Sequence, residues 1–322
     1  MTWGQTMWQR VLDIFLSPNR LNLRLVLGML LWLALLIFEK PDLGSRKWGE
    51  FLLILAALLV VPIGLTWLIP LNDGRIQTLW RCLHGLHLPA GILLAVSFSL
   101  QPGMAAVLSA VPWIGVLFGL FLLGLSRLIN SHSWDASELS FDIGGMFTII
   151  GGAWLVCDRS AYRPFGFDSE IVLLTAIHFH YPQPALPLAA GLLAQAEPRW
   201  WTKLSALGTI VTVPLVAAGI TVTHFTNFMN LESLAASLLS LFGIVVAVGQ
   251  LFLIRRTTLL IITRLGLAVG ALALMGAMVL SLLYGLRPYL QLRELDIPFM
   301  RKWHGSLGAL AFAAVTLMSW YH

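Results

Sequence analysis

Ten apolar runs, each close to the length of a membrane-spanning helix, divide the 322 residues almost end to end. A helix needs about 20 apolar residues to cross the hydrocarbon core of a bilayer. Backbone groups in lipid must bond to one another within the protein, which favours helices here. The sequence therefore predicts an all-α, polytopic transmembrane bundle of about ten helices. The runs cover residues 23–38, 50–70, 79–100, 104–129, 141–157, 169–195, 204–224, 234–254, 258–286 and 304–321.

The composition is typical of a protein whose main solvent is lipid. Hydrophobic residues make up 58% of the chain and charged residues 11%, whereas soluble domains have about 25% charged residues. The net charge of +5 comes from Lys and Arg in short connections. Membrane lipids with anionic headgroups are therefore the expected partners, and nucleic acid is not. Cys82 and Cys157 lie in or beside apolar runs, so neither a disulfide framework nor a cluster site is expected.

The predicted organisation is a single integral-membrane domain over residues 1–322, with a juxtamembrane segment at 1–22. The first apolar run follows Arg10 and Arg20 and lacks a small-residue cleavage site, which indicates a retained helix. An inside N-terminus places eleven of the 20 Lys and Arg inside and nine outside, a small bias in the favoured direction. We expect a multi-pass protein of the bacterial inner membrane, and the oligomeric state is left open.

Two segments depart from the plain apolar pattern. Residues 127–142 form a polar re-entry between two runs, and residues 158–187 begin with charged groups and end in three prolines. Proline removes a backbone donor and clashes with the carbonyl four residues earlier. A helix broken by prolines at membrane depth needs protein or a wet cavity to satisfy the freed groups. We therefore expect a cavity beside His178, His180 and the proline bend.

His178 and His180 are the first candidates for chemistry. A spacing of two residues on a helix is a rotation of about 200°, so the rings point in opposite directions while the helix is regular. A histidine that faces a cavity acts as a proton carrier or hydrogen-bond donor. The structural alternative is an interhelical hydrogen bond that only fixes packing. Ionisable residues inside membranes are costly, which favours the functional interpretation.

His84 and His87 form a second candidate, because a spacing of three places both on one helix face. Such a pair can bind a polar substrate group, an oxyanion, zinc or haem, or form only a polar seam near the membrane surface. Zinc normally takes three or four ligands, and His178 or His304 would have to complete the set. We therefore predict no metal and no cofactor, and we interpret the pair as substrate-binding.

The charged run from Asp158 to Glu170 is the third candidate. Asp168 is expected to cap a helix that starts at Ser169, with Glu170 in its first turn. Arg163 is expected to pair with Glu170 or Asp168, or to bind an anionic group as a fork. A carboxylic acid in an apolar cavity can act as a general acid near neutral pH, and Glu170 fits this role best. The alternative is a solvated loop with helix caps.

Other polar or aromatic residues complete the predicted substrate-binding set. Asp142 opens a glycine-rich stretch, DIGGMFTIIGG, that permits close helix contact, and His304 opens the last apolar run. Each residue alone is more often structural than catalytic. The set is His84, His87, Asp142, Trp154, Thr175 and His304.

Motifs for nucleotide-driven chemistry are absent from the sequence. The chain has no phosphate-binding loop, no dinucleotide fingerprint, no H-E-x-x-H and no G-x-S-x-G elbow. Phosphoryl transfer and hydride transfer from a nucleotide are therefore poorly supported.

Three stretches of the chain resemble the YndJ-like family of membrane proteins. They are LHLPAGILLAVSFSLQPGMAAVLSAVPW at 86–113, YRPFGFDSEIVLLTAIHFHY at 162–181 and WHGSLGAL at 303–310. The most specific part is GF-D-x-x-I-V-x-L-T-A-x-H-F-H-Y, after which the chain has PQPALP where the family pattern resembles A-G-F-x-L-P. The resemblance implies a polytopic fold without an established chemistry, so no catalytic role is transferred. Its motif members are Arg163, Glu170, Thr175, His178, His180 and His304.

Three functional classes remain open. The first is an integral-membrane enzyme that converts an isoprenoid or lipid-like substrate by general acid–base chemistry, such as isomerisation, cyclisation or epoxide opening. Glu170 would donate a proton, His178 or His180 would be its partner, and Arg163 would orient the acid or the substrate. The others are a proton-coupled transporter that uses the same groups and a structural subunit of a membrane complex. We favour the enzyme, because secondary transporters often show paired broken helices and this sequence shows one.

Overall fold

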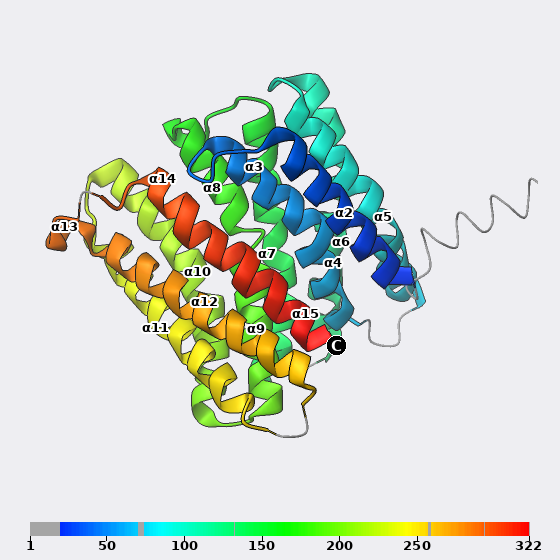
Figure 1. Ribbon diagram of the computed structural model, residues 1–322, viewed down its shortest axis with the longest axis vertical. Helices are drawn as coiled ribbons and strands as arrows, with labels where there is room; N and C mark the ends of the chain where they lie inside the picture. The colour runs from blue at the N-terminus through cyan, green and yellow to red at the C-terminus, as the bar shows by residue number, and fades with distance from the viewer. Residues whose placement is uncertain (1–19, 70–73, 132, 257–258, 293, 322) are drawn as a thin grey trace, which may run out of the picture.

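The computed structural model describes residues 20–69, 74–131, 133–256, 259–292 and 294–321. Within these ranges every regular element is a helix, which confirms the predicted all-α bundle (Figure 1). In the described part of the chain, eight helical spans are long and apolar enough to cross a membrane by length and composition. The predicted juxtamembrane segment lies almost wholly outside the described ranges.

The eight spans follow the predicted apolar runs closely. They are α2 (Leu21–Glu39), the Arg46–Trp67 span, α5 (Gly74–Ser99), α6 (Met104–Ser131), α7 (Ala136–Arg159), α10 (Trp200–Thr226), α11 (Asn230–Leu253) and α12 (Ile261–Gly285). The runs predicted at 169–195 and 304–321 are helical as well, but each is divided into shorter elements. A short helix, α13 (Arg287–Leu290), follows α12.

The Arg46–Trp67 span is the central helix, and 89% of its most apolar window is buried. It consists of α3 (Arg46–Leu55), a π-helical turn η2 (Ala56–Val60), α4 (Val61–Gly64) and η3 (Leu65–Trp67). Two carbonyls just before the π-helical turn accept bonds from side chains of other segments. Trp32 Nε1 donates to the Phe51 carbonyl at 2.8 Å, and the Tyr181 hydroxyl donates to the Leu52 carbonyl at 2.6 Å. These bonds fix α2 and the segment around Tyr181 against the central helix.

The predicted proline break divides one apolar segment into α8 (Ser169–His178) and α9 (Pro182–Ala196). Residues 179–181 form a turn, and α9 starts at Pro182, a helix position where proline is tolerated. Asp168 caps α8 by accepting a backbone amide at 2.9 Å, as expected. The principal neighbours of α8 are α7 and α3, whereas those of α9 are α7, α10 and α11. The two halves of the broken helix therefore pack in different surroundings.

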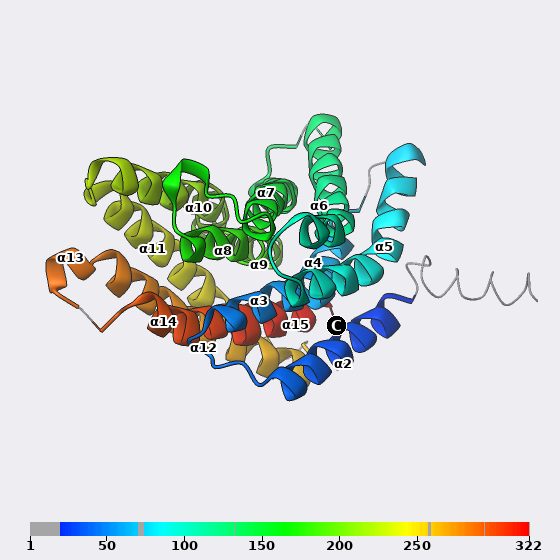
Figure 2. The same cartoon turned by 90° about the horizontal axis from the view of Figure 1, so that it is seen from above.

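The last span is a continuous helical stretch from Ile297 to Tyr321. It consists of α14 (Ile297–Met300), two π-helical segments η5 (Arg301–Gly305) and η6 (Leu307–Ala314), and α15 (Val315–Tyr321). This C-terminal helix, red in Figures 1 and 2, packs beside α12 and the central helix. π-Helical turns are uncommon in proteins and frequently occur at functional sites. The segment η5 is therefore a candidate location for a functional site.

Most of the described residues in the polar stretch 127–142 lie in the helices α6 and α7. Arg127 lies near the end of α6, and Glu138 and Asp142 lie in the first turns of α7. Arg127 Nε donates to Asp142 at 2.6 Å, and its Nη2 donates to Glu138 at 2.5 Å. The Arg127 Nη1 donates to the carbonyl of Ile69. This mutual pairing lets charged residues lie inside helical spans, which hydropathy does not reveal.

Candidate functional site

The helix α8 and the C-terminal helix face each other through two pairs of side chains. Glu170 and His178 are eight residues apart on α8, hence on one face and about 12 Å apart along the axis. Glu170 pairs with Arg301, and the His178 ring faces the His304 ring. Arg301 and His304 are three residues apart in η5. The structure thus places Glu170, His178 and His304 along one helix–helix contact.

The His178 and His304 rings form a pair with centroids 6.4 Å apart and planes 21° apart. His178 Nδ1 lies 2.7 Å from the Leu174 carbonyl, and His304 Nδ1 lies 2.9 Å from the Ala277 carbonyl. A carbonyl oxygen only accepts, so each Nδ1 bears the proton and each Nε2 keeps a lone pair. In the described part of the chain, neither Nε2 has a hydrogen bond. The His178 side chain is exposed and that of His304 is half-buried.

Glu170 belongs to a network of charges at the N-terminal end of α8. Arg301 binds one carboxylate oxygen, and Arg46 Nη1 lies 3.7 Å from the other. Arg46 also pairs with Asp158, a fully buried carboxylate that lies 3.4 Å from Arg159 Nε. Glu170 is therefore placed as an ion-pair partner, and its predicted role as proton donor stays a prediction without geometric support.

His180 lies in the turn that follows α8, and its ring contacts Trp113 and not the His178–His304 pair. Trp113 Nε1 donates to His180 Nε2 at 3.0 Å, and His180 Nδ1 donates to the Ala176 carbonyl at 2.7 Å. The His180 and Trp113 side chains are both fully buried. His180 therefore does not share the contact of Glu170 and His178. Both of its ring nitrogens form hydrogen bonds, so neither is free for proton transfer.

Arg163 lies outside the charged network. Its side chain is exposed, and its guanidinium donates to the Tyr162 carbonyl. Glu170 binds Arg301 instead, and Asp168 caps α8. The expected pairing of Arg163 with either acid is therefore wrong, because the loop before α8 leaves its side chain exposed.

Asp142, Trp154 and Thr175 have contacts of their own. Asp142 pairs with Arg127 near the start of α7, about 24 Å along that helix from Asp158. The Trp154 ring packs against the Phe167 ring with centroids 5.9 Å apart. The Thr175 hydroxyl donates within α8 to a carbonyl four residues earlier at 2.7 Å. Their role in substrate binding stays a prediction.

His84 and His87 are fully buried on one face of α5. The Trp80 ring meets the His84 ring edge-on, with centroids 4.4 Å apart, and His87 Nδ1 donates to the His84 carbonyl at 2.9 Å. Among the residues that the structure describes, both nitrogens of His84 and the Nε2 of His87 lack a hydrogen-bond partner. Across the described ranges, no group of three His, Cys, Asp or Glu residues is arranged to hold a metal ion. The predicted substrate-binding role of the pair stays a prediction.

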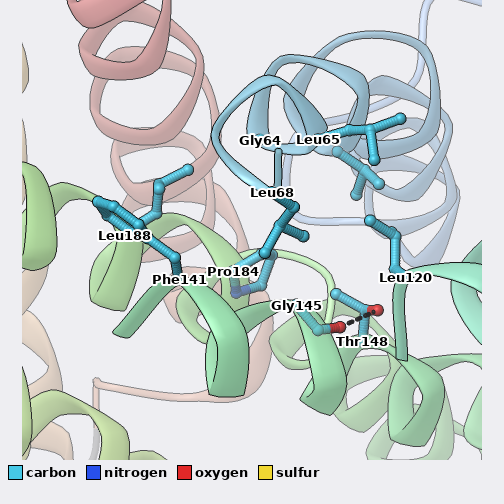
Figure 3. A pocket seen from close by; sticks show the side chains of 10 residues that line it. Gly64, Leu65, Leu68, Leu120, Phe141, Gly145, Thr148, Pro184 and Leu188 are labelled. Carbon is cyan, nitrogen blue, oxygen red and sulfur yellow. Dashed lines mark hydrogen bonds between the residues drawn. The ribbon is translucent and has the colours of Figure 1, made fainter. Parts of the chain in front are cut away.

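An apolar hollow lies beside the proline-rich helix α9 (Figure 3). Its walls come from the central helix, α6, α7 and α9, and the Thr148 hydroxyl on its wall donates to the Gly145 carbonyl at 2.7 Å. His178 and His180 are not among the lining residues, so this hollow is not the cavity expected beside them. The residues that line it are Val61, Gly64, Leu65, Leu68, Leu120, Phe141, Gly145, Thr148, Pro184 and Leu188.

Sequence reasoning missed the residues that hold the site together: Arg301, Arg46 and Trp113. Arg301 lies 131 positions from its partner Glu170, and Trp113 lies 67 positions from His180. Contacts at such separations leave no periodic signal in a single chain. The available signals were weak ones: a basic residue three positions before His304, and a tryptophan at the end of the stretch 86–113.

Side chains from the three stretches are therefore in contact. Trp113 of the stretch 86–113 bonds to His180 of the stretch 162–181, and His178 of that stretch faces His304 of the stretch 303–310. A family model described as YndJ-like protein matches residues 51–312. The chain belongs to the YndJ-like family. This confirms the resemblance, and the YndJ-like region includes both α8 and His304.

A curated YndJ-like relative, "Uncharacterized membrane protein YndJ" of Bacillus subtilis (strain 168), is 25% identical over 299 residues. These residues make up 92% of this chain and 52% of the relative, so the chain spans about half the length of the curated relative it matches. No solved structure matches the chain. The family match and the eight apolar spans agree on a multi-pass integral membrane protein.

Proposed function

We propose that this chain is an integral-membrane enzyme that converts a lipophilic, isoprenoid or lipid-like substrate by acid–base chemistry at the His178–His304 pair. The observation that supports this proposal is the tautomer of both rings. Each Nδ1–H is bound to a backbone carbonyl, so each Nε2 offers a lone pair. Neutral imidazole with a free nitrogen is the common form of a general base.

The surroundings of the pair favour a lipophilic substrate. The ten residues of α8 rise about 15 Å, half the thickness of the hydrocarbon core, so His178 lies near the bilayer midplane if α8 stands along the membrane normal. His178 is exposed there, at the end of an apolar helix. A molecule that reaches the exposed ring at this depth has to be soluble in the bilayer.

The chemistry that fits is proton transfer within one substrate molecule. One Nε2 removes a proton from carbon, and the resulting imidazolium returns it to a different carbon, so that a double bond moves and no co-reactant is consumed. Isomerisation is the outcome that this sequence of steps gives. Glu170 and Arg301 hold the C-terminal helix against α8 in this proposal, and His180 lies outside the reaction centre.

The test compares lipid extracts of cells that lack the gene with cells that express wild-type protein, His178→Ala or His304→Ala. Chromatography coupled to mass spectrometry should show a lipophilic compound that changes retention without changing mass in wild-type cells and in neither variant. His224→Ala is the matched control, since His224 is an exposed histidine that contacts the Phe165 carbonyl through Nε2. Wild-type lipid profiles in both variants would rule out the pair as the reaction centre.

Proton-coupled transport is a second candidate, favoured by the broken helix that ends at His178. Transporters often place substrate and proton sites where a membrane helix is interrupted near the midplane. Purified protein in liposomes with an internal pH dye would distinguish the two. Proton movement driven by a gradient, lost in His178→Ala, favours transport, and isomerised lipid without proton movement favours the enzyme.

A further inference from the structure

His180 occupies a site built for a single ring orientation. Its Nδ1–H donates to the Ala176 carbonyl and its Nε2 accepts from Trp113, so one neutral tautomer satisfies both nitrogens. The planes of the His180 and Trp113 rings are 24° apart, and their centroids are 6.2 Å apart. Turning the His180 ring would break its hydrogen bonds and leave a buried donor and acceptor without partners, which costs free energy in the interior.

The neighbouring helix α7 is shaped to admit this ring. A Cβ on Gly151 would lie 2.7 Å from His180 Nδ1 and 2.9 Å from the Phe179 Cβ, closer than real Cβ atoms approach. Trp113, on α6, is among the largest fully buried side chains of the molecule. The ring of His180 is therefore held between α6 and α7 with no room to turn.

The position of His178 depends on the Trp113–His180 contact, because the helix is broken between His178 and Pro182. At Phe179 the chain leaves the helix and at Pro182 it starts the next, so the end of α8 is not aligned by a continuous helix axis. His180 lies in the turn after α8, where its ring meets Trp113, whereas the His178 ring at the end of α8 faces His304. Anchoring His180 against Trp113 therefore fixes the rotation of the end of α8 and with it the side on which His178 emerges.

We infer that the Trp113–His180 hydrogen bond, here called the latch, holds the end of α8 so that His178 lies opposite His304. His180 is then a positioning residue, and Trp113 is its hydrogen-bond partner. The inference rests on the proposed function only because the pair that it positions is the proposed reaction centre. The test therefore measures geometry and needs no substrate.

Full-length protein with Cys82 and Cys157 replaced by Ser and with His178→Cys and His304→Cys is treated with a short bis-maleimide in detergent. Trp113→Phe removes the indole donor and His180→Ala removes the ring, and each should lower the rate of 178–304 cross-linking severalfold. His180→Gln keeps an acceptor for Trp113 and should restore the rate. Trp80→Phe is the matched control, since Trp80 Nε1 donates to the Leu65 carbonyl away from α8.

Unchanged cross-linking in folded Trp113→Phe and His180→Ala protein would overturn the latch. If those variants do not fold, nitrogen-15 NMR of histidine-labelled wild-type protein decides. The latch requires the Nδ1–H tautomer at His180, and a proton on Nε2 would refute it, because Trp113 cannot then donate. If Trp113→Phe lowers cross-linking in the cysteine background but leaves the lipids unchanged in cells whose protein keeps His178 and His304, the latch stands and the proposed reaction is rejected.

Discussion

Asp158 is a carboxylate with no exposed surface, and Arg46 and Arg159 are its charged partners. Removing one member of a buried ion pair leaves the other charges uncompensated, which typically costs about 3–5 kcal/mol. We therefore expect Asp158→Ala to lower the free energy of unfolding by an amount in this range. Denaturant unfolding in detergent measures it.

An exposed ion pair provides the control for Asp158. Lys203 pairs with Asp135 at 3.1 Å, and both side chains are more than a third exposed. Such pairs contribute about 0–1 kcal/mol, so Lys203→Ala should change stability little. Equal losses in Lys203→Ala and Asp158→Ala would show that burial of the carboxylate does not set its importance.

The contribution of Asp135, the N-cap residue of α7, to the stability of the fold depends on pH. A hydrogen bond from the Ser137 amide, helped by Lys203, lowers the pKa of the Asp135 carboxyl below its usual value. A group with a lower pKa in the folded state stabilises the fold above its unfolded pKa of about 3.9 and loses that contribution as pH falls further. Asp135→Asn should therefore make the unfolding temperature less dependent on pH below about 4. An identical pH dependence in the variant would assign the acid sensitivity to other carboxylates.

Two glycines of α6 show how an element is fixed by its neighbour. A Cβ on Gly124 would overlap the Asp142 carbonyl oxygen of α7, whereas a Cβ on Gly115 meets nothing within 4 Å. Gly124→Ala should push α6 and α7 apart and lower the unfolding temperature. Gly115→Ala should raise it slightly, since alanine is favoured over glycine in helices by about 1 kcal/mol. Thermal unfolding of both variants checks this, and a stable Gly124→Ala protein would contradict the close packing of the two helices.

The elements were predictable where a local physical signal exists. Apolar length located the spans, and Pro182 located the break, because the residue before a proline is disfavoured in a helix. Pro187, which was also expected to interrupt the run, lies inside α9. The site was only partly predictable. The spacing of His178 and His180 showed that they diverge, but nothing in the sequence paired Glu170 with Arg301 or His180 with Trp113. Which helices touch, and with which faces, depends on packing between segments far apart in the chain.

At the scale of the whole molecule, the broken helix determines the topology. If α8 and α9 together cross the membrane, Tyr162 before them and Trp200 after them lie on opposite sides. Both residues are exposed, so Tyr162→Cys and Trp200→Cys in a background without Cys82 and Cys157 are suitable for labelling. With an inside N-terminus, a membrane-impermeant maleimide should label position 162 from outside and position 200 only after permeabilisation. Labelling of both from one side would show that the broken segment re-enters.

The π-helical segment η6 has more residues in each turn than an α-helix has. Its hydrogen bonds close over five residues where an α-helix uses four, so η6 could lose one residue and revert to an α-turn. Beyond it, Thr316 and Ser319 would still face Gly270 and Gly266 of α12. The same deletion in α12, which is α-helical throughout, would rotate every later side chain by about 100°. The end of this chain can therefore absorb a small change in length that its neighbour cannot.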